Sequence, residues 1–304
     1  MMYDVTIVGA GPAGLSAALW LGRCRRQVLV CDTGHPRNAR SHAMHGFLTR
    51  DGIPPAAFLQ QGREQLRTYP TVEFRTMAVV DAERSADQFT VTLADGSRQT
   101  SRKLLFTTGM VDELPAIAGI ETFYGTSAFP CPYCDGWEVR DQPLAVYGKD
   151  ESGKRLALQL TQWSRDLVFC TDGPSALSRQ DLAQLAHLGM AAREERIARL
   201  EGREGQLEAI VFENGERLPR RALFLHPHQR QQCDLPAKLG YVFPAERLGL
   251  RMEGYEQAAV PGLYVAGEAF RSLWVINAAS EGVEAAFFIN VALLMEDVGS
   301  VQQS

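Results

Sequence analysis

Two cysteines, Cys131 and Cys134, are separated by only two residues in the stretch 131–136, which reads CPYCDG. Cysteines at this spacing can close a small disulfide ring and open it again to two thiols, through attack of a thiolate on a sulfur. Asp135 directly follows the second cysteine, where a carboxyl group could supply or take up the proton that the exchange requires. The same spacing also provides half of a zinc site, so redox and metal chemistry both remain open at this point.

The elements that must position this pair begin with a glycine-rich turn near the N-terminus. The apolar run 4–8 predicts a buried strand, residues 9–14 (GAGPAG) follow at once, and the pattern over 15–21 predicts a helix. A second strand is predicted over 27–32, and it ends in an acid, Asp32. This order of strand, G-x-G-x-x-G, helix, strand and acid is typical of a dinucleotide site.

Each member of this pattern has a physical role. Gly9 makes the tight turn, Gly11 lets the backbone approach a pyrophosphate, and Gly14 lets the helix pack closely on the strand. The helix N-terminus faces the phosphates, and Asp32 accepts a hydrogen bond from a ribose hydroxyl. We therefore predict that the N-terminal part of the chain binds a dinucleotide.

The rest of the chain predicts a second unit of the same kind. It begins with a strand at 143–147, a helix at 152–163 and a strand at 167–170. Further strands are predicted at about 72–80, 88–94, 98–106, 207–213, 221–225 and 262–266, and a long helix at about 278–296. We expect an α/β protein with two Rossmann-like, doubly wound, three-layer nucleotide-binding domains.

The composition is that of a globular enzyme and excludes several classes of partner. The 304 residues carry a formal net charge of -5, which argues against a nucleic-acid or anionic-membrane partner. No apolar run approaches the ~18 residues needed to span a bilayer, and the N-terminus enters a strand pattern without a signal segment. Six cysteines are too few for a disulfide scaffold, so we expect a cytoplasmic protein that binds neither nucleic acid nor membrane.

The motifs, in this order and spacing, resemble the low-molecular-weight thioredoxin reductase family of flavoproteins nearly from end to end. The matching pieces are residues 9–14, 107–109 (TTG), 131–136 and 265–268 (VAGE). The resemblance implies an FAD-binding domain in two segments, 1–114 and 244–304. It places residues 115–243 in an inserted NAD(P)-type domain that carries the redox cysteines, and it implies a homodimer.

Carried over by position, the resemblance also implies the roles of single residues. Contacts to FAD would come from Gly9, Gly11, Pro12, Ala13, Gly14, Asp32, Thr108 and Gly109. Gly267 and Glu268 fall where the family has Gly-Asp, whose acid binds the ribityl chain, so Glu268 is one methylene longer. Cys134 would face the flavin and Cys131 would exchange with the substrate, while Asp135 would be the acid/base. The substrate would be a dithiol or disulfide, in a small molecule or in a thioredoxin-like protein.

Redox chemistry is favoured over zinc at the cysteine pair. A zinc site needs two further ligands in a suitable arrangement. Cys24 and Cys31 are the only other closely spaced pair, and they fall in the first predicted helix and strand, where small buried residues are expected. We therefore predict no metal site, and we predict that Cys131, Cys134 and Asp135 are catalytic.

The glycine turn of the second unit departs from the dinucleotide pattern. It reads GKDESG over 148–153, so Asp150 stands where the second glycine is needed and Glu151 lies beside it. A side chain there blocks the approach of a pyrophosphate, and two carboxylates repel it. Residues 171–173, after the next strand, read TDG with no arginine adjacent, which disfavours a 2′-phosphate. We therefore predict weak or absent use of NADPH.

Two branches of the family that the chain resembles fit a lost NADPH site. In dithiol oxidases of the gliotoxin and holomycin type, the cysteine pair takes electrons from a small dithiol, and reduced flavin passes them to oxygen. In the other branch, ferredoxin or a second flavin supplies electrons for a protein disulfide. Residues 36–38 (PRN) and the pair His42 and His45 favour the first branch, where the histidines would assist thiol deprotonation. Structural roles for both histidines remain the alternative.

Two further functions also stay open from the sequence. One is an NAD(P)H-dependent thioredoxin reductase, if the altered turn still binds the nucleotide. The other belongs to a different class, a flavin-binding redox sensor with little turnover. The intact cysteine pair with its acid, Asp135, argues against the sensor. Neither the substrate nor the direction of electron flow can be read from the residues.

Overall fold

The computed structural model describes residues 2–243, 260–270 and 274–301, which form two compact units. Unit 1 contains Met1–Ala39, Pro55–Val111 and Arg230–Ser304, and unit 2 contains Arg40–Pro54 and Asp112–Gln229. These bounds differ from the expected ones, because residues 40–54 group with unit 2 and the chain returns to unit 1 at Arg230. Residues 244–259, with which the expected second FAD segment begins, lie outside the described residues.

Unit 1 is built on a seven-stranded sheet with the order β3-β2-β1-β6-β5-β4, in which β17 also pairs with β6. Strands β3, β2, β1, β6 and β17 are parallel, whereas β6, β5 and β4 pair in antiparallel fashion. The expected strand at 72–80 is in fact two strands, β3 and β4. The elements are β1 (Met2–Val8), α1 (Pro12–Arg23), β2 (Val28–Asp32), α2 (Pro55–Leu66), β3 (Val72–Thr76), β4 (Val79–Ser85), β5 (Gln88–Leu93), β6 (Arg98–Phe106), α7 (Leu235–Lys238), β17 (Leu263–Val265), the 3-10 helix η1 (Gly267–Ala269) and α8 (Val275–Val301).

Buried apolar residues place β1 at the centre of this sheet. Val5 and Ile7 belong to one apolar core, together with residues of α1 and α8, and Val8 belongs to a second core. Val8 is paired with Cys31 of β2 on one side and with Phe106 of β6 on the other, so the strand order reverses at β1. Ligands of open α/β sheets bind beyond the carboxyl ends of the strands at such a point. This end of β1 is where the turn 9–14 begins.

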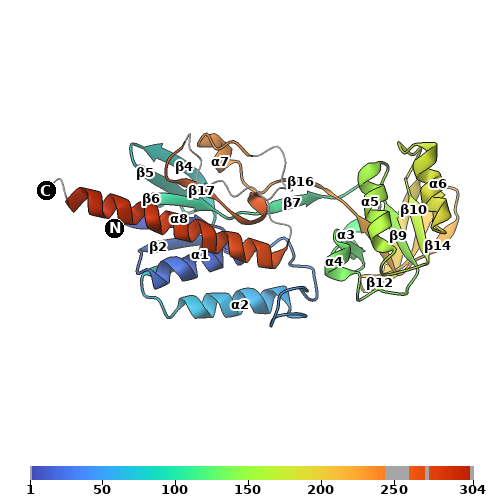
Figure 1. Cartoon of the computed structure of the whole chain (residues 1–304), viewed down its shortest axis with the longest axis horizontal. Coiled ribbons are helices and arrows are strands. Elements are labelled where there is room, and N and C mark those ends of the chain that lie inside the picture. Colours follow the sequence, from blue (N-terminus) through green and yellow to red (C-terminus); the bar gives the residue numbers. More distant parts are fainter. Residues whose placement is uncertain (1, 244–259, 271–273, 302–304) are drawn as a thin grey trace. The chain divides into compact units, whose positions relative to one another are not determined.

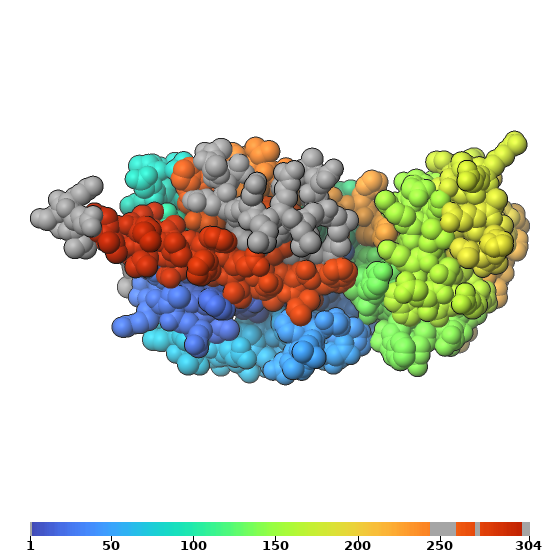
Figure 2. All heavy atoms as spheres, in the orientation of Figure 1, coloured from blue at the N-terminus to red at the C-terminus, as the bar shows by residue number. Residues whose placement is uncertain are grey.

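Helix α8 packs along α1 and is the longest helix of the described residues (Figure 1). Its stretch Val275–Gly299 is long and apolar enough, by length and composition, to cross a membrane, so the expectation that no stretch approaches that length was wrong. However, 39% of the 18-residue apolar segment within that stretch is buried inside the structure, and Ala285, Ala286 and Ile289 lie in the core. Much of the helix also lies along the visible surface of unit 1 (Figure 2). These contacts are those of a core helix that keeps one face exposed.

Unit 2 contains a five-stranded parallel sheet with the order β11-β10-β9-β15-β8 and a three-stranded antiparallel sheet, β12-β13-β14. Its elements are α3 (Ile120–Phe123), β8 (Ala128–Phe129), α4 (Pro132–Asp135), β9 (Leu144–Tyr147), α5 (Glu151–Leu160), β10 (Leu167–Cys170), α6 (Arg179–His187), β11 (Ala191–Arg193), β12 (Ile197–Arg203), β13 (Gln206–Phe212), β14 (Arg217–Pro219) and β15 (Ala222–Leu225). The parallel strands at the centre of each main sheet, with the helices that connect them, confirm the predicted α/β class and the pair of Rossmann-like folds.

Two short strands accompany the passages between the units. β7 (Met110–Glu113) and β16 (His228–Gln231) pair as a two-stranded sheet. The polar residues Asp112 and Glu113 are therefore part of a strand. In unit 2, β9 lies between β10 and β15, with Tyr147 paired to Cys170 and Leu225. The strand order thus reverses at β9 as it does at β1, and the turn 148–153 begins at this second switch point.

Candidate active site

The two cysteines of the 131–136 stretch are joined by a disulfide, with Cα atoms 5.3 Å apart. Cys131 is the N-cap of α4, and Cys134 lies within this short helix. Since α4 directly follows β8 at the edge of the parallel sheet, the sheet fixes the start of the disulfide ring. Among the residues that the structure describes, no group of three or more His, Cys, Asp and Glu side chains is arranged to hold a metal ion. The geometry of the pair is that of a ring that exchange with a thiol can open.

Two aromatic residues, Tyr133 and Trp137, lie next to the disulfide cysteines in the sequence. Tyr133, between the cysteines, meets the Trp163 ring edge-on with centroids 5.5 Å apart, yet it stays 56% exposed. Trp137 is 64% exposed, with the Arg140 guanidinium 4.0 Å from its ring centroid. Large exposed rings offer apolar contact area at low entropic cost. These exposed rings give residues 131–137 an apolar surface against which a substrate could pack.

The carboxyl group of Asp135 lies in an environment that favours its neutral form. Its partial burial is the largest cause that raises its pKa, from 3.8 to about 7, and the neighbouring Glu138 carboxylate acts in the same direction. The nearby His45 opposes the shift. A carboxyl group with a pKa near neutrality can both accept and return a proton at pH 7. Asp135 is therefore suited to the acid/base role expected of it.

Unit 1 holds the other predicted residues, beginning with the turn 9–14. A β-carbon on Gly9, whose φ is +102°, would lie 2.6 Å from the Thr107 carbonyl oxygen, and one on Gly14 would overlap the Gly9 carbonyl oxygen. Both glycines are thus required by packing inside the protein. A β-carbon on Gly11 would meet nothing within 4 Å. The space beside Gly11 is the place where an outside group could approach the backbone, as the sequence pattern predicts for a pyrophosphate.

Asp32 ends β2 beside this turn. Its Oδ1 accepts a hydrogen bond from the Ala10 N–H at 2.9 Å, and its Oδ2 accepts from Gly34 N–H at 2.9 Å and from Arg63 at 3.0 Å. A carboxylate oxygen has two lone pairs, so Oδ2 is filled while Oδ1 retains one. The predicted bond from a ribose hydroxyl would have to use Oδ1.

Residues of three segments form the remaining part of this site. The Thr108 hydroxyl oxygen is buried and has no hydrogen-bond partner among the described residues. Glu268 lies close by, since its Oε2 would be 3.8 Å from a β-carbon on Gly109, and its Oε1 accepts from Arg37 at 2.5 Å. A β-carbon on Gly267 would come within 2.9 Å of the Ala13 Cβ, just after Pro12 at the start of α1. A buried donor without a partner, beside an open glycine turn, fits a bound group such as FAD.

Sequence reasoning missed four residues that hold these parts in place. Thr107 donates to the Gly9 carbonyl oxygen at 2.7 Å, and the buried Glu281 accepts from the Gly267 N–H at 2.9 Å. Arg63 holds Asp32, and Arg37 holds Glu268. A carboxylate within an apolar helix is a signal that could have identified Glu281. Arg37 lies in the stretch 36–38 that the sequence singled out, whereas nothing in the local pattern points to Arg63.

The turn 148–153 of unit 2 has the same backbone packing but a different centre. Gly148 and Gly153 pack on each other as Gly9 and Gly14 do, because a β-carbon on Gly148 would lie 2.6 Å from the Gly153 Cα. Asp150, in the place of Gly11, is the N-cap of α5, and its Oδ1 accepts from the N–H groups of Ser152 at 3.0 Å and Gly153 at 3.2 Å. A carboxylate of the protein thus occupies the helix N-terminus that would bind a pyrophosphate.

The segment after β10 is also held by contacts of a carboxylate, that of Asp172. Asp172 accepts from the Ile197 N–H at 2.8 Å, and its Oδ2 lies 3.8 Å from the Lys149 Nζ. The sequence shows no arginine adjacent to residues 171–173, but the fold brings the Arg196 guanidinium to 3.8 Å from the position of a β-carbon on Gly173. The fold thus supplies an arginine to this segment from outside the local sequence.

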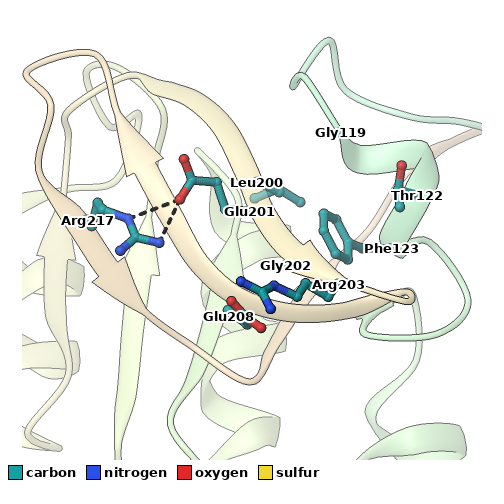
Figure 3. A pocket seen from close by; sticks show the side chains of 9 residues that line it. All are labelled: Gly119, Thr122, Phe123, Leu200, Glu201, Gly202, Arg203, Glu208 and Arg217. Atoms are coloured by element: carbon teal, nitrogen blue, oxygen red, sulfur yellow. Dashed lines mark hydrogen bonds and ion pairs between the residues drawn. The ribbon is translucent and has the colours of Figure 1, made fainter.

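A separate hollow of about 490 Å³ lies between α3 and the β12-β13-β14 sheet (Figure 3). The ion pair of Glu201 with Arg217, 2.7 Å long, forms part of its wall. None of the predicted site residues lines this hollow. It is therefore distinct from the disulfide and from the glycine turns.

Comparisons with known proteins agree with these features. The model of the pyridine nucleotide-disulphide oxidoreductase family matches residues 3–282. The thioredoxin reductase tcpT of Claviceps purpurea is 28% identical over 286 residues, which cover 88% of this chain and 86% of that relative. TrxB, a thioredoxin reductase-like protein of Bacillus anthracis, has a similar crystal structure, with a TM-score of 0.91, 33% identity, and 97% and 99% of the two chains covered. The crystal structure of HlmI gives a TM-score of 0.89 at 36% identity, covering 99% of this chain and 96% of that one.

Proposed function

We propose that this chain, which belongs to the pyridine nucleotide-disulphide oxidoreductase family, exchanges electrons between FAD, the Cys131–Cys134 disulfide and an external dithiol or disulfide. We propose further that this exchange makes no efficient use of NADPH. The chain is a thioredoxin reductase-like oxidoreductase that acts on disulfides, and its family implies a flavin cofactor. The observation that carries the proposal beyond the family is the Asp150 carboxylate at the N-terminus of α5.

The two glycine turns support the proposal that unit 1 binds its nucleotide and that unit 2 binds one poorly. In unit 1, the space beside Gly11 is open and the Thr108 hydroxyl lacks a partner among the described residues, so the turn 9–14 and Asp32 would hold FAD. In unit 2, Asp150 already satisfies two N–H groups of α5, and Glu151 adds a second negative charge. A pyrophosphate would have to displace one carboxylate and approach another, which is unfavourable.

The proposed exchange runs in the direction of dithiol oxidation. A substrate thiolate attacks the Cys131 sulfur, the Cys131–Cys134 bond breaks, and Cys134 leaves as a thiolate. The second substrate thiol, deprotonated in turn, attacks the substrate sulfur of the mixed disulfide and releases Cys131. The substrate loses two electrons and two protons. The protein disulfide gains the two electrons, the proton of the first thiol goes to solvent before the attack, and Asp135 accepts the proton of the second thiol. When bound, FAD supplies a two-electron store between the cysteine pair and an acceptor such as oxygen.

A specific observation favours one alternative, an NAD(P)H-dependent thioredoxin reductase. Arg196 lies beside Gly173, near the end of β10, where a guanidinium could pair with a 2′-phosphate. Its effect is opposed by Asp172 on the same segment, so we keep this function second. A reductase that draws electrons from ferredoxin or a second flavin shares the disulfide chemistry and differs only in the electron donor. A redox sensor would not require Asp135 to have a pKa near 7.

Anaerobic titration of the purified, FAD-loaded protein tests the proposal. We expect dithiothreitol to bleach the flavin absorbance and air to restore it, while NADPH and NADH at equal micromolar concentrations bleach it at least about tenfold more slowly, the ratio that ~1.4 kcal/mol produces. Rapid bleaching by NADPH would establish the alternative reductase. No bleaching by the dithiol would overturn the proposed exchange itself.

A matched pair of variants tests whether Asp150 is the cause of weak NADPH use. Asp150→Gly removes the carboxylate from the N-terminus of α5, and we expect NADPH-driven bleaching to become about tenfold faster. Ser178→Ala removes the N-cap of α6 instead, whose hydroxyl accepts from the Asp181 N–H at 3.2 Å. It should destabilise the protein by about 1 kcal/mol and leave the NADPH rate unchanged. Equal NADPH rates in Asp150→Gly and wild type would show that this carboxylate is not the obstacle.

We also propose that the protein is a homodimer, with the exposed face of α8 in the interface. Phe287 is 53% exposed, Phe288 45% and Met295 65%, whereas the neighbouring Ile289 is buried in the core. Exposed apolar groups in such number on one helix are typical of an interaction surface. Light scattering should give a mass of two chains, and Phe287→Glu should shift it towards one. A single-chain mass for the wild type at about 10 μM, a concentration at which an interface of standard size holds, would refute the dimer.

A further inference from the structure

Gln231, the last residue of β16, carries a buried amide oxygen that has no hydrogen-bond partner among the described residues. Its amide nitrogen donates to the Ala269 carbonyl oxygen at 2.9 Å. Because a carbonyl oxygen can only accept, this bond fixes which end of the amide is the nitrogen and which is the oxygen. The oxygen Oε1 is therefore an acceptor with a defined orientation and no partner from the protein.

The neighbours of Gln231 place this amide at the predicted flavin site of unit 1. The Gln232 N–H donates to the Gly109 carbonyl oxygen at 3.2 Å. Ala269, which accepts from Gln231, directly follows Glu268. These three segments of unit 1 therefore meet at one place. Two of them carry the residues, Gly109 and Glu268, for which the sequence predicts contacts to FAD.

A second buried oxygen without a partner belongs to the same group of segments. The Thr108 hydroxyl, directly before Gly109, also has no hydrogen-bond partner among the residues that the structure describes. The space beside Gly109 leads to Glu268, whose Oε2 would be 3.8 Å from a β-carbon on that glycine. A buried polar atom without a partner is costly. Two such atoms on neighbouring segments indicate a bound group that the protein itself does not supply.

The atoms gathered here favour a bound group that brings hydrogen-bond donors. The amide oxygen of Gln231 and the carboxylate of Glu268 can only accept, whereas the Thr108 hydroxyl can donate or accept. The pyrophosphate of FAD offers acceptors, so it does not suit Gln231 Oε1. The flavin half of FAD carries the hydroxyl groups of the ribityl chain and one ring N–H, and each of these can donate.

We propose that Gln231 Oε1 accepts a hydrogen bond from the flavin half of FAD, which makes Gln231 a further cofactor-binding residue. This inference rests on the proposed function for the identity of the cofactor. The bond to Ala269 holds the amide in its orientation before the cofactor binds, so the contact costs little side-chain entropy. The local sequence gives no signal for this role, because Gln231 lies outside every motif that resembles the family.

Two substitutions separate the two ends of the amide. Gln231→Lys keeps a donor for the Ala269 carbonyl oxygen but has no acceptor, whereas Gln231→Glu keeps an acceptor but has no donor. Gln232→Lys and Gln232→Glu place the same charges on the exposed neighbouring residue and are the matched controls. The dissociation constant of FAD is measured by serial dilution of the full-length, FAD-loaded protein, with the released FAD separated by ultrafiltration and quantified by its absorbance. The dissociation constant of ADP, which lacks the flavin half, is measured by competition.

The two variants should differ in the order that a contact through Oε1 requires. In Gln231→Lys, the dissociation constant of FAD should rise about tenfold, the factor that ~1.4 kcal/mol produces, while that of ADP stays at the wild-type value. In Gln231→Glu and in both Gln232 variants, the dissociation constant of FAD should stay within about threefold of the wild-type value. If Gln231→Lys does not fold, the uncharged Gln231→Met takes its place, with the same rise expected because it also lacks the acceptor.

Three results would overturn the inference. FAD bound more weakly by Gln231→Glu than by Gln231→Lys would show that the role of Gln231 is the bond to Ala269 alone. Equal FAD affinity in Gln231→Lys and wild type would show that water satisfies Oε1. A fall in ADP affinity as large as that in FAD affinity would remove the contact from the flavin half. A wild-type protein that binds no FAD would instead refute the proposed function, and this contact with it.

Discussion

Replacing Cys134 with serine should lower dithiol-driven flavin bleaching by roughly 10³-fold or more, the scale on which removal of a reacting group acts. A serine hydroxyl forms no disulfide, so the ring of Cys131 and Cys134 cannot close and the electron pair of a substrate dithiol has no route through the protein. Anaerobic bleaching with dithiothreitol, followed in a stopped-flow instrument, measures the loss. The free Cys131 of this variant should instead attack an added linear disulfide such as cystamine, keep one half of it as a mixed disulfide and release the other half as a thiol, which intact mass detects.

The control carries the same chemical change at another cysteine. Cys24 is an exposed free cysteine that caps the C-terminus of α1, and Cys24→Ser should bleach at the wild-type rate. A Cys134→Ser protein that still bleaches within about tenfold of wild type, a change of only ~1.4 kcal/mol in the barrier, would exclude the cysteine pair from the reaction. A redox sensor differs in a further way, since it would keep its partner binding after the substitution.

Replacing Asp135 with asparagine should slow the exchange by about 10²- to 10³-fold at pH 7, as expected for the loss of a general acid/base. The wild-type rate should rise with pH as Asp135 ionises near pH 7, since the carboxylate is the form that accepts the thiol proton. Asparagine does not titrate in this range, so the rising limb near pH 7 should be absent from the variant. Rates measured between pH 5 and pH 9 in one buffer series give both profiles.

The stability of the same variant serves as its control. Since the pKa of Asp135 is raised from 3.8 to about 7 in the folded protein, its ionisation opposes folding, and stability is lost as the pH rises from the lower value through the higher. Asp135→Asn removes this loss, and its melting temperature at pH 8 should equal or exceed that of the wild type. A slow variant that also melts earlier would show damage to the fold. A variant with the wild-type rate and limb would refute the acid/base role.

The parts of the site that lie in a continuous stretch were the most predictable from the sequence. Residues 9–14 follow β1 and run into the first turn of α1, because packing between neighbouring segments requires Gly9 and Gly14. The spacing of Cys131 and Cys134 likewise fits a ring closed within one helical turn. Local rules suffice where neighbours in sequence make the contacts.

The contacts that join distant segments could not be predicted in this way. Arg37 reaches Glu268 across 231 residues of sequence, and His45 reaches Glu138 because the loop 40–54 belongs to the same unit as residues 112–229. No pattern within a window of residues reports such pairs. At Asp150 the sequence predicted an obstacle to the pyrophosphate, but only the structure shows its form, an aspartate that caps α5.

Because residues 40–54 group with unit 2, that unit is encoded by two separate stretches of the sequence. The chain passes between the units four times, at 39/40, 54/55, 111/112 and 229/230, instead of the two times that a simple insertion requires. Unit 2 is therefore not a cassette that could be excised or transplanted as one continuous stretch. A clone of residues 112–229 alone would keep both cysteines and Asp135 but lose Arg40 and His45. Circular permutation or chimera design must carry the short loop along with the long segment.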